Sequence, residues 1–197
     1  MVEQRKNILD AALDEFSASG LNGASVESIA ERAQVSPAVV RALFVDKERL
    51  MTAVLQEVTD PLVSAISLAI EGSKDTKARI RETIELLDEW LLENYSYIRF
   101  IQWCLLERPN SIHKMYEQSF YPSEYFEKLE EDISGGQIQA KDPFAVVLIL
   151  DSLIFFSHMM RPAMESLRPD ATAEVLMEER REIIMDLLEK GLFTKDT

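Results

Sequence analysis

The side chains whose types and spacing point to chemistry lie between residues 25 and 47, and that chemistry is the binding of phosphate. Ser25 and Ser36 each stand just before a short helical pattern. A serine there caps the helix, whose free N–H groups can face an anion. Arg41 is the one cation inside the second short helix, and Lys47 opens the pattern that follows. We expect Lys47 to reach phosphate, and Arg41 could do so as well.

The sequence offers little that would support catalysis. It contains no glycine-rich nucleotide loop, no cluster of metal ligands and no nucleophile motif. The acidic pairs Glu130-Glu131 and Glu178-Glu179 have the pattern of solvated helix faces. We therefore expect neither an enzyme nor a cofactor.

A buried charge is predicted in the second half of the chain, where Asp151 interrupts an otherwise apolar helical run. A lone buried carboxylate is costly, so Asp151 needs a partner or a wet surface. It could bind a cationic or hydroxylated ligand, a second subunit or a neighbouring arginine. His158 lies seven residues later on the same face, but together with His113 it gives no metal-ligand spacing.

Helices must position all of these residues, because helical periodicity dominates the chain and no stretch alternates convincingly with period two. Gly20 ends the first predicted helix, and Asp60-Pro61 either kinks the fourth or caps its continuation through Ile70. The predicted helices cover Glu3–Ser19, Ser25–Ala33, Ser36–Leu43, a stretch from Lys47, Thr76–Asn94, Tyr97–Glu107, Ser111–Ile133, Pro143–Met160 and Thr172–Lys190.

Composition and charge fit a folded protein with an acidic body. The 197 residues carry a net charge of −14, of which residues 1–50 contribute only −2. That balance argues against a general nucleic-acid coat protein. The lone Cys104, the polar N-terminus and the short apolar run at Phe144–Met160 favour a cytoplasmic protein with no membrane partner.

Residues 25–43 have the pattern of a helix-turn-helix, whose second helix fits the major groove of DNA. The wider pattern is more specific. It comprises the run Ile8–Phe16, Gly20, the run Ser25–Ala30, Ala33, Val35-Ser36, Phe44, Lys47 and Leu50. In order and without a gap over about residues 5–50, it closely resembles the N-terminal domain of the TetR family.

That resemblance implies an all-α fold in two domains, a DNA-binding domain at residues 1–50 and a ligand-binding and dimerisation domain at 51–197. The expected partners are double-stranded operator DNA, a small-molecule effector and a second copy of the chain. The expected DNA-binding residues are Ser25, Ser36, Pro37, Ala38, Val39, Arg41 and Lys47. The small core of this domain is predicted to contain Ala11, Ala12, Phe16, Ile29, Ala30, Ala33, Val35, Val40 and Phe44.

Four positions depart from the family pattern, and one of them is Ala38, where the family often has glycine. Gln34 stands where glycine is usual, and a left-handed backbone there would cost a non-glycine residue roughly 1–2 kcal/mol. Arg41 and Leu43 replace aromatic residues that commonly contact the DNA backbone. Arg41 could bind phosphate or read a guanine, whereas Leu43 can make no such hydrogen bond.

Residues 51–197 are rich in aromatic residues and methionine, which suit an adaptable apolar cavity as well as ordinary packing. The resemblance implies a cavity between the middle helices. Its expected lining residues are Phe100, Trp103, Cys104, Tyr116, Phe120, Phe126, Asp151 and Phe155.

The helix at Pro143–Met160 is apolar almost all round, which makes sense if one side faces a partner. The resemblance implies a four-helix dimer interface made with the helix at Thr172–Lys190. The expected mechanism is that of a repressor, in which an effector that favours another spacing of the two heads lowers DNA affinity. An enzyme and a ligand-binding or adaptor protein without DNA binding remain the alternatives.

Overall fold

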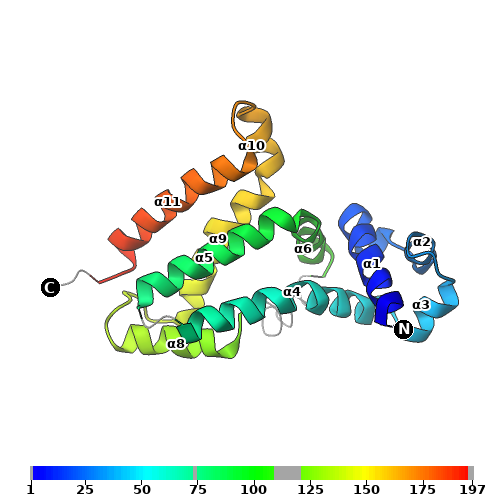
Figure 1. The fold of residues 1–197 in the computed structure, drawn as a ribbon, viewed down its shortest axis with the longest axis horizontal. Helices are drawn as coiled ribbons and strands as arrows, with labels where there is room; N and C mark the ends of the chain where they lie inside the picture. Colours follow the sequence, from blue (N-terminus) through cyan, green and yellow to red (C-terminus); the bar gives the residue numbers. More distant parts are fainter. Residues whose placement is uncertain (1, 73–74, 109–120, 195–197) are drawn as a thin grey trace. The chain divides into compact units, whose positions relative to one another are not determined.

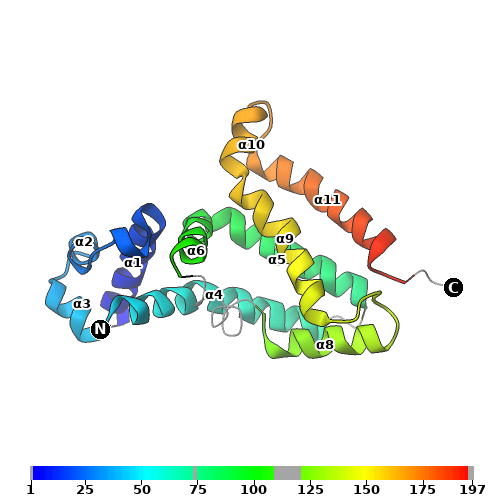
Figure 2. The same cartoon turned by 180° about the vertical axis from the view of Figure 1, so that it is seen from behind.

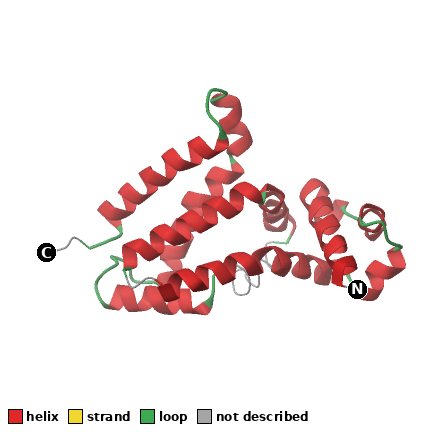
Figure 3. Ribbon diagram, in the orientation of Figure 1, coloured by secondary structure: helices red, strands yellow, loops and turns green. Residues whose placement is uncertain are grey.

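The computed structural model describes residues 2–72, 75–108 and 121–194. Within these ranges the regular structure is helical, as Figure 3 shows, and the one β-type contact is an isolated antiparallel bridge between Ile138 and Phe193. The predicted all-α fold is confirmed for this part of the chain.

Contacts divide the chain into two compact units. The first contains residues 1–61 and 94–120, and the second contains residues 62–93 and 121–197. The described helices of the first unit are α1 (Val2–Gly23), α2 (Val26–Arg32), α3 (Pro37–Leu43), the first part of α4 (Lys47–Gly72) and α6 (Tyr95–Glu107) (Figure 1). Residues 2–47, which hold α1, α2 and α3, are called the head below.

The core of the head is the one predicted from the sequence. Ile29 and Ala30 of α2 are fully buried, and so is Phe16 of α1. Val35 is the exception, since it is only half-buried in the turn between α2 and α3. Small alanines in α1 and α2 let these helices approach closely. The predicted residues that are buried are Ala11, Ala12, Phe16, Ile29, Ala30, Ala33, Val40 and Phe44.

Gly20 ends the first helical stretch of α1, as predicted. The glycine has φ 72° and ψ 177°, and helical structure resumes beyond it to Gly23. That backbone region is essentially restricted to glycine. The break turns the chain just before α2.

Pro61 lies inside α4, which continues from Lys47 to Gly72. Of the two sequence-based alternatives at Asp60-Pro61, a separate capped helix is therefore wrong. A proline in a helix interior removes one backbone hydrogen bond. Just before it, Thr59 donates its hydroxyl to the carbonyl of Leu55 at 2.8 Å.

The second unit holds the rest of α4 and five further described helices. These are α5 (Thr76–Glu93), α8 (Ser123–Ser134), α9 (Pro143–Met159), α10 (Arg161–Leu167) and α11 (Ala173–Gly191). A continuous helix over Ser111–Ile133 is wrong, because Pro122 caps α8 and residues 109–120 lie outside the described residues. The helix that begins at Pro143 ends at Met159, and after a bend of 56° α10 begins at Arg161, with Pro162 in its first turn.

A buried polar cluster joins three helices of the second unit, α5, α9 and α11. Figure 2 shows the ribbons of these helices from behind. Asp88 of α5 accepts a hydrogen bond from Arg180 of α11, and its Oδ1 lies 3.0 Å from Nε2 of His158 in α9. Arg180 also donates to the carbonyls of Leu153 and Ile154 in α9, at 3.3 and 3.2 Å. One guanidinium therefore bonds to two other helices.

By length and composition, α4 is the one described helix that could cross a membrane, and 39% of its most apolar window is buried. Together, α9 and α10 reach the same composition, but they are bent by 56° at the break between them. Core helices of water-soluble proteins also meet this criterion, so α4 is weak evidence for a span.

Candidate nucleic-acid interface

The turn between α2 and α3 has the hydrogen bonds of a Schellman motif. The N–H of Val35 donates to the carbonyl of Ala30 at 2.9 Å, and the N–H of Gln34 donates to that of Glu31 at 3.1 Å. Gln34 has φ 56°, the left-handed conformation that glycine usually supplies. The backbone expected of a helix-turn-helix is therefore present despite the glutamine.

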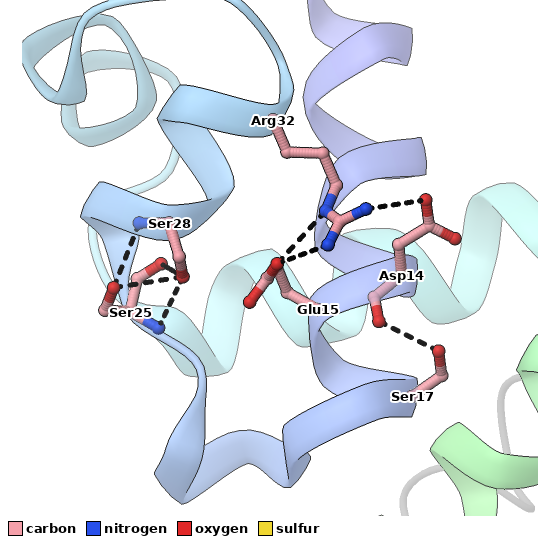
Figure 4. Close-up of polar contacts among 6 residues, drawn as sticks. All are labelled: Asp14, Glu15, Ser17, Ser25, Ser28 and Arg32. Carbon is pink, nitrogen blue, oxygen red and sulfur yellow. Dashed lines mark hydrogen bonds and ion pairs between the residues drawn. The ribbon is translucent and has the colours of Figure 1, made fainter.

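Ser25 caps α2 as predicted, and its capping is reciprocal. The hydroxyl of Ser25 accepts from the N–H of Ser28 at 3.0 Å, while the hydroxyl of Ser28 accepts from the N–H of Ser25 at 3.2 Å (Figure 4). This capping box fixes the first turn of α2. The capping role is thus structural, whether or not Ser25 also contacts DNA.

Arg32, at the other end of α2, ties that helix to α1. Its guanidinium donates twice to Oε1 of Glu15, at 3.0 and 2.8 Å, and NH1 lies 3.8 Å from Oδ2 of Asp14, as Figure 4 shows. These bonds hold α2 against α1, and α3 follows through the Schellman turn.

The surface of α3 is free of cover within the head. Val40 is its buried residue, whereas Ala38, Arg41 and Leu43 are exposed. Ser36 occupies the N-cap position, but its side chain makes no capping hydrogen bond, so the prediction that its hydroxyl caps α3 is wrong. Its role in fixing the first turn falls instead to Pro37, whose ring sets the first helical φ.

The exposed guanidinium of Arg41 pairs with the carboxylate of Glu27 in α2. The hydrogen bond from Arg41 holds the pKa of Glu27 below its ordinary value. The only cation of α3 is therefore oriented by an acidic neighbour from the preceding helix.

Lys47 forms hydrogen bonds with backbone carbonyl groups of the head. Its ammonium donates to the carbonyls of Leu21 and Ala24, at 2.5 and 2.9 Å. The side chain is half-buried. Its predicted contact with DNA phosphate stays a prediction.

Three residues predicted to line a ligand cavity lie on α6 in the first unit. Phe100 stacks on Phe16 of α1 with ring centroids 5.6 Å apart. Trp103 lies against Gly20, and Cys104 is buried. In the described contacts Phe100 and Trp103 pack against α1, and their part in ligand binding stays a prediction.

Three other lining candidates, Phe126, Asp151 and Phe155, lie on α8 and α9 in the second unit. Asp151 is buried and accepts a hydrogen bond at 2.8 Å from the hydroxyl of Tyr121, which satisfies the predicted need for a partner. The ring of Tyr121 meets that of Phe126 edge-on at 6.3 Å. Phe155 is half-buried on α9. The candidates Tyr116 and Phe120 lie outside the described residues.

The outward side of α9 is apolar in this single chain. Its buried side includes Val147, Leu150 and Ile154, as expected of a helix with one side in its own core. The exposed side carries Phe144, Leu148, Ile149 and Phe156, each 50–61% exposed. On α11, Val175, Ile183 and Leu187 are exposed in the same way. Apolar side chains in such continuous rows are unusual on a monomer surface.

Sequence reasoning missed several partners of the candidate residues. The sequence analysis did not pair Glu27 with Arg41, although a Glu in α2 and a lone cation in α3 were a usable signal. Glu107, which binds the backbone beyond Gly20, had no sequence signal because the two residues are far apart in the chain. The same holds for Tyr121 with Asp151 and for Asp88 with His158.

Comparison with known proteins matches residues 8–54 to the family described as "Bacterial regulatory proteins, tetR family". The chain is 33% identical over 85 residues to the nicotine-responsive transcriptional repressor HdnoR of Paenarthrobacter nicotinovorans, covering 43% of this chain and 44% of the relative. It is 33% identical over 99 residues to the transcriptional activator FasR of Mycolicibacterium smegmatis, covering 50% of this chain and 45% of the relative. The alignments thus span less than half of either relative.

Solved structures extend the likeness over nearly the whole chain. A TetR family transcription regulator from Marinobacter aquaeolei VT8 superposes with a TM-score of 0.73 at 19% identity, covering 98% of this chain and 97% of the other. At that identity the likeness shows a shared fold.

Proposed function

We propose that this chain is a regulator of the TetR type, a cytoplasmic repressor that binds palindromic operator DNA as a homodimer and is released by a small molecule. The exposed α3 is the observation that carries the proposal. Its surface side chains stand on a helix that is fixed by the Schellman turn before it and by the packing of Val40 near its middle. The major groove of B-DNA is just wide enough for such a helix.

Arg41 is the residue of α3 best suited to specific binding. The pair with Glu27 limits the rotamers of the guanidinium before DNA arrives, which lowers the entropy lost on binding. A guanidinium can bond a guanine through two parallel hydrogen bonds or bind a phosphate. Ser25, Ser36, Pro37, Ala38, Val39 and Lys47 complete the proposed contact surface.

The test of this assignment is the Arg41→Ala variant, measured by fluorescence anisotropy on a duplex that the wild type selects from a random pool. We expect a loss of about 1–3 kcal/mol in binding free energy and relaxed preference at one base pair. Arg99→Ala, which removes an exposed cation from α6, is the matched control for net charge. Equal affinity of wild type and Arg41→Ala would remove Arg41 from the interface.

Dimerisation is proposed through the outward faces of α9 and α11. Two copies of the apolar rows would pack as a four-helix interface around a two-fold axis. Such a dimer presents two copies of α3 to half-sites about one helical turn apart.

The effector is proposed to bind in the second domain, residues 51–197, beside Asp151 and the lining candidates of the same compact unit, Phe126 and Phe155. Tyr121 and Phe126 already gather aromatic surface around that carboxylate. HdnoR is described as responsive to nicotine, a small amine, and a buried carboxylate with aromatic neighbours suits a ligand of that chemistry. An effector that binds the released state more tightly lowers DNA affinity by that difference.

The second candidate is a ligand-binding or adaptor protein of the same fold that does not bind DNA. It is favoured by the neutralisation of Arg41 by Glu27 and by the exposed Leu43, which offers no hydrogen bond to phosphate. Failure of the wild type to select any duplex at moderate salt would favour this candidate.

A further inference from the structure

The break of α1 at Gly20 leaves backbone groups that need partners outside the helix. The N–H groups of Leu21 and Asn22 both donate to Oε2 of Glu107, at 2.8 and 3.0 Å. Glu107 is the last residue of α6, 85 residues further along the chain than Asn22. One carboxylate of α6 therefore takes the role that a capping residue would play for the resumed part of α1.

The fit around Gly20 is close. A Cβ atom at this position would lie 2.7 Å from Oε1 of Glu107 and 2.9 Å from the ring of Trp103. Glycine is thus required both by its φ of 72° and by the approach of these two side chains. Stacking of Phe16 on Phe100 holds the same two helices together one turn earlier in α1.

Two carbonyl groups just after Gly20 also have a side-chain partner. The ammonium of Lys47, at the start of α4, donates to the carbonyls of Leu21 and Ala24, whereas Glu107 accepts from the N–H groups of Leu21 and Asn22. Residues 20–24 are therefore held by an anion from α6 and by a cation from α4. Ser25, the cap of α2, is the next residue, so the direction in which α2 leaves α1 is set by these bonds.

We propose that Glu107 is a positioning residue for DNA binding: through the N–H groups of Leu21 and Asn22 it fixes the exit from α1 and hence the placement of α2 and α3. The inference rests on the proposed function for its DNA readout. In this proposal Glu107 does not itself contact DNA. It acts through Leu21 and Asn22, which no sequence pattern linked to α6.

The experiment compares Glu107→Ala and Glu107→Gln in the full chain, with Glu93→Ala as the control for loss of an exposed glutamate at the end of α5. The readouts are anisotropy on the duplex that the wild type selects and on a duplex of random sequence. We expect Glu107→Ala to bind the selected duplex roughly tenfold more weakly, Glu107→Gln to fall in between, and Glu93→Ala to match the wild type. The glutamine keeps the side-chain length and one acceptor oxygen.

The ratio of the two affinities separates positioning from simple loss of stability. A variant that is partly unfolded loses affinity for both duplexes by the same folded fraction. A misplaced helix pair loses base contacts but keeps non-specific attraction to phosphate, so affinity for the selected duplex falls more. Hydrogen exchange of a peptide covering residues 21–22, followed by mass spectrometry, should be faster in Glu107→Ala.

The outcomes distinguish this inference from the proposed function. If the wild type selects no duplex, the proposed function fails, and faster exchange at residues 21–22 still reports whether Glu107 holds the segment. If the wild type binds but both Glu107 variants keep its affinity ratio, the positioning role is overturned. Tighter binding by Glu107→Ala would also overturn it, because the carboxylate would then compete with phosphate for the N–H groups. If Glu107→Ala does not fold, Glu107→Gln carries the test.

Discussion

Gln34 adopts a left-handed backbone conformation that glycine usually supplies. The position closes the Schellman turn after α2 with φ 56°, and its side chain is exposed. Because the side chain is exposed, its burial contributes little that could offset the cost of this conformation. Two backbone hydrogen bonds stabilise the turn. The buried side chains of Ala33 before it and Val40 after it also hold the two helices in this arrangement.

The Gln34→Gly variant should therefore be more stable than the wild type by about 1 kcal/mol, since glycine adopts a left-handed backbone without a steric cost and only part of the gain is lost to chain entropy. Thermal unfolding at a fixed protein concentration measures the change. Gln56→Gly, at an exposed interior position of α4, should have the opposite sign, a loss of up to about 1 kcal/mol. A lower melting temperature for Gln34→Gly would show that the side chain contributes something that its backbone does not reveal.

Cys104 is a second residue whose behaviour follows from its surroundings. Burial, aided by the negative charge of Glu107, raises the pKa of this thiol from an ordinary 9.0 to about 12. The thiolate is the nucleophile, so native protein should react with iodoacetamide far more slowly than protein unfolded in urea. Because the unfolded thiol ionises first as pH rises from 9.0 toward 12, this residue lowers stability in that range and not below it. Equal labelling rates in the native and unfolded states would contradict the burial.

At the scale of elements, the sequence predicted the helices well where caps and breakers are local. The bounds of α2, α3 and α5 differ by one or two residues from the prediction, because Ser25, Pro37 and Thr76 mark the starts. The helix stop at Gly20 was also predicted, but the helical turn beyond it was not. The N–H of Leu21 in that turn donates to Glu107, which is distant in the sequence.

Among the candidate site residues, too, those with a local sequence pattern could be predicted and those with distant partners could not. The core of the head could be predicted because its residues recur at helical spacing within one short stretch. The pairing of Arg41 with Glu27 and the packing of α6 on α1 could not be, since neither leaves a periodic signal.

The cluster of Asp88, His158 and Arg180 is the element-level feature with the clearest energetic consequence. The Arg180→Met variant would leave the carboxylate of Asp88, 2% exposed, without its cation, at a cost of about 3–5 kcal/mol. Arg181→Met, one residue along α11, is the matched control and should change stability by less than about 0.5 kcal/mol. Urea unfolding at one protein concentration compares the two. Similar losses in both variants would mean that the buried pair adds no more than any charge on α11.

The whole molecule is proposed to act as a dimer, and the outward face of α9 makes this testable. Ile149 is 52% exposed at the centre of the apolar row. A glutamate there would have to be desolvated inside the proposed interface, so Ile149→Glu should sediment as a monomer at concentrations where the wild type is a dimer. Leu68→Glu, on the exposed side of α4 and 69% exposed, is the control. A wild type that sediments as a monomer, or an Ile149→Glu variant that stays dimeric, would rule out this interface.

The proposal that α3 enters a major groove is tested most directly by the DNA that the protein selects. The wild type should enrich a two-fold symmetric sequence from a random duplex pool, with half-sites about one helical turn apart and an affinity that falls steeply with salt. Arg41→Ala should enrich a sequence in which the preference at one base pair of each half-site is relaxed. Enrichment of no sequence by the wild type, or of a palindrome with unchanged preference at every position by both proteins, would contradict the account.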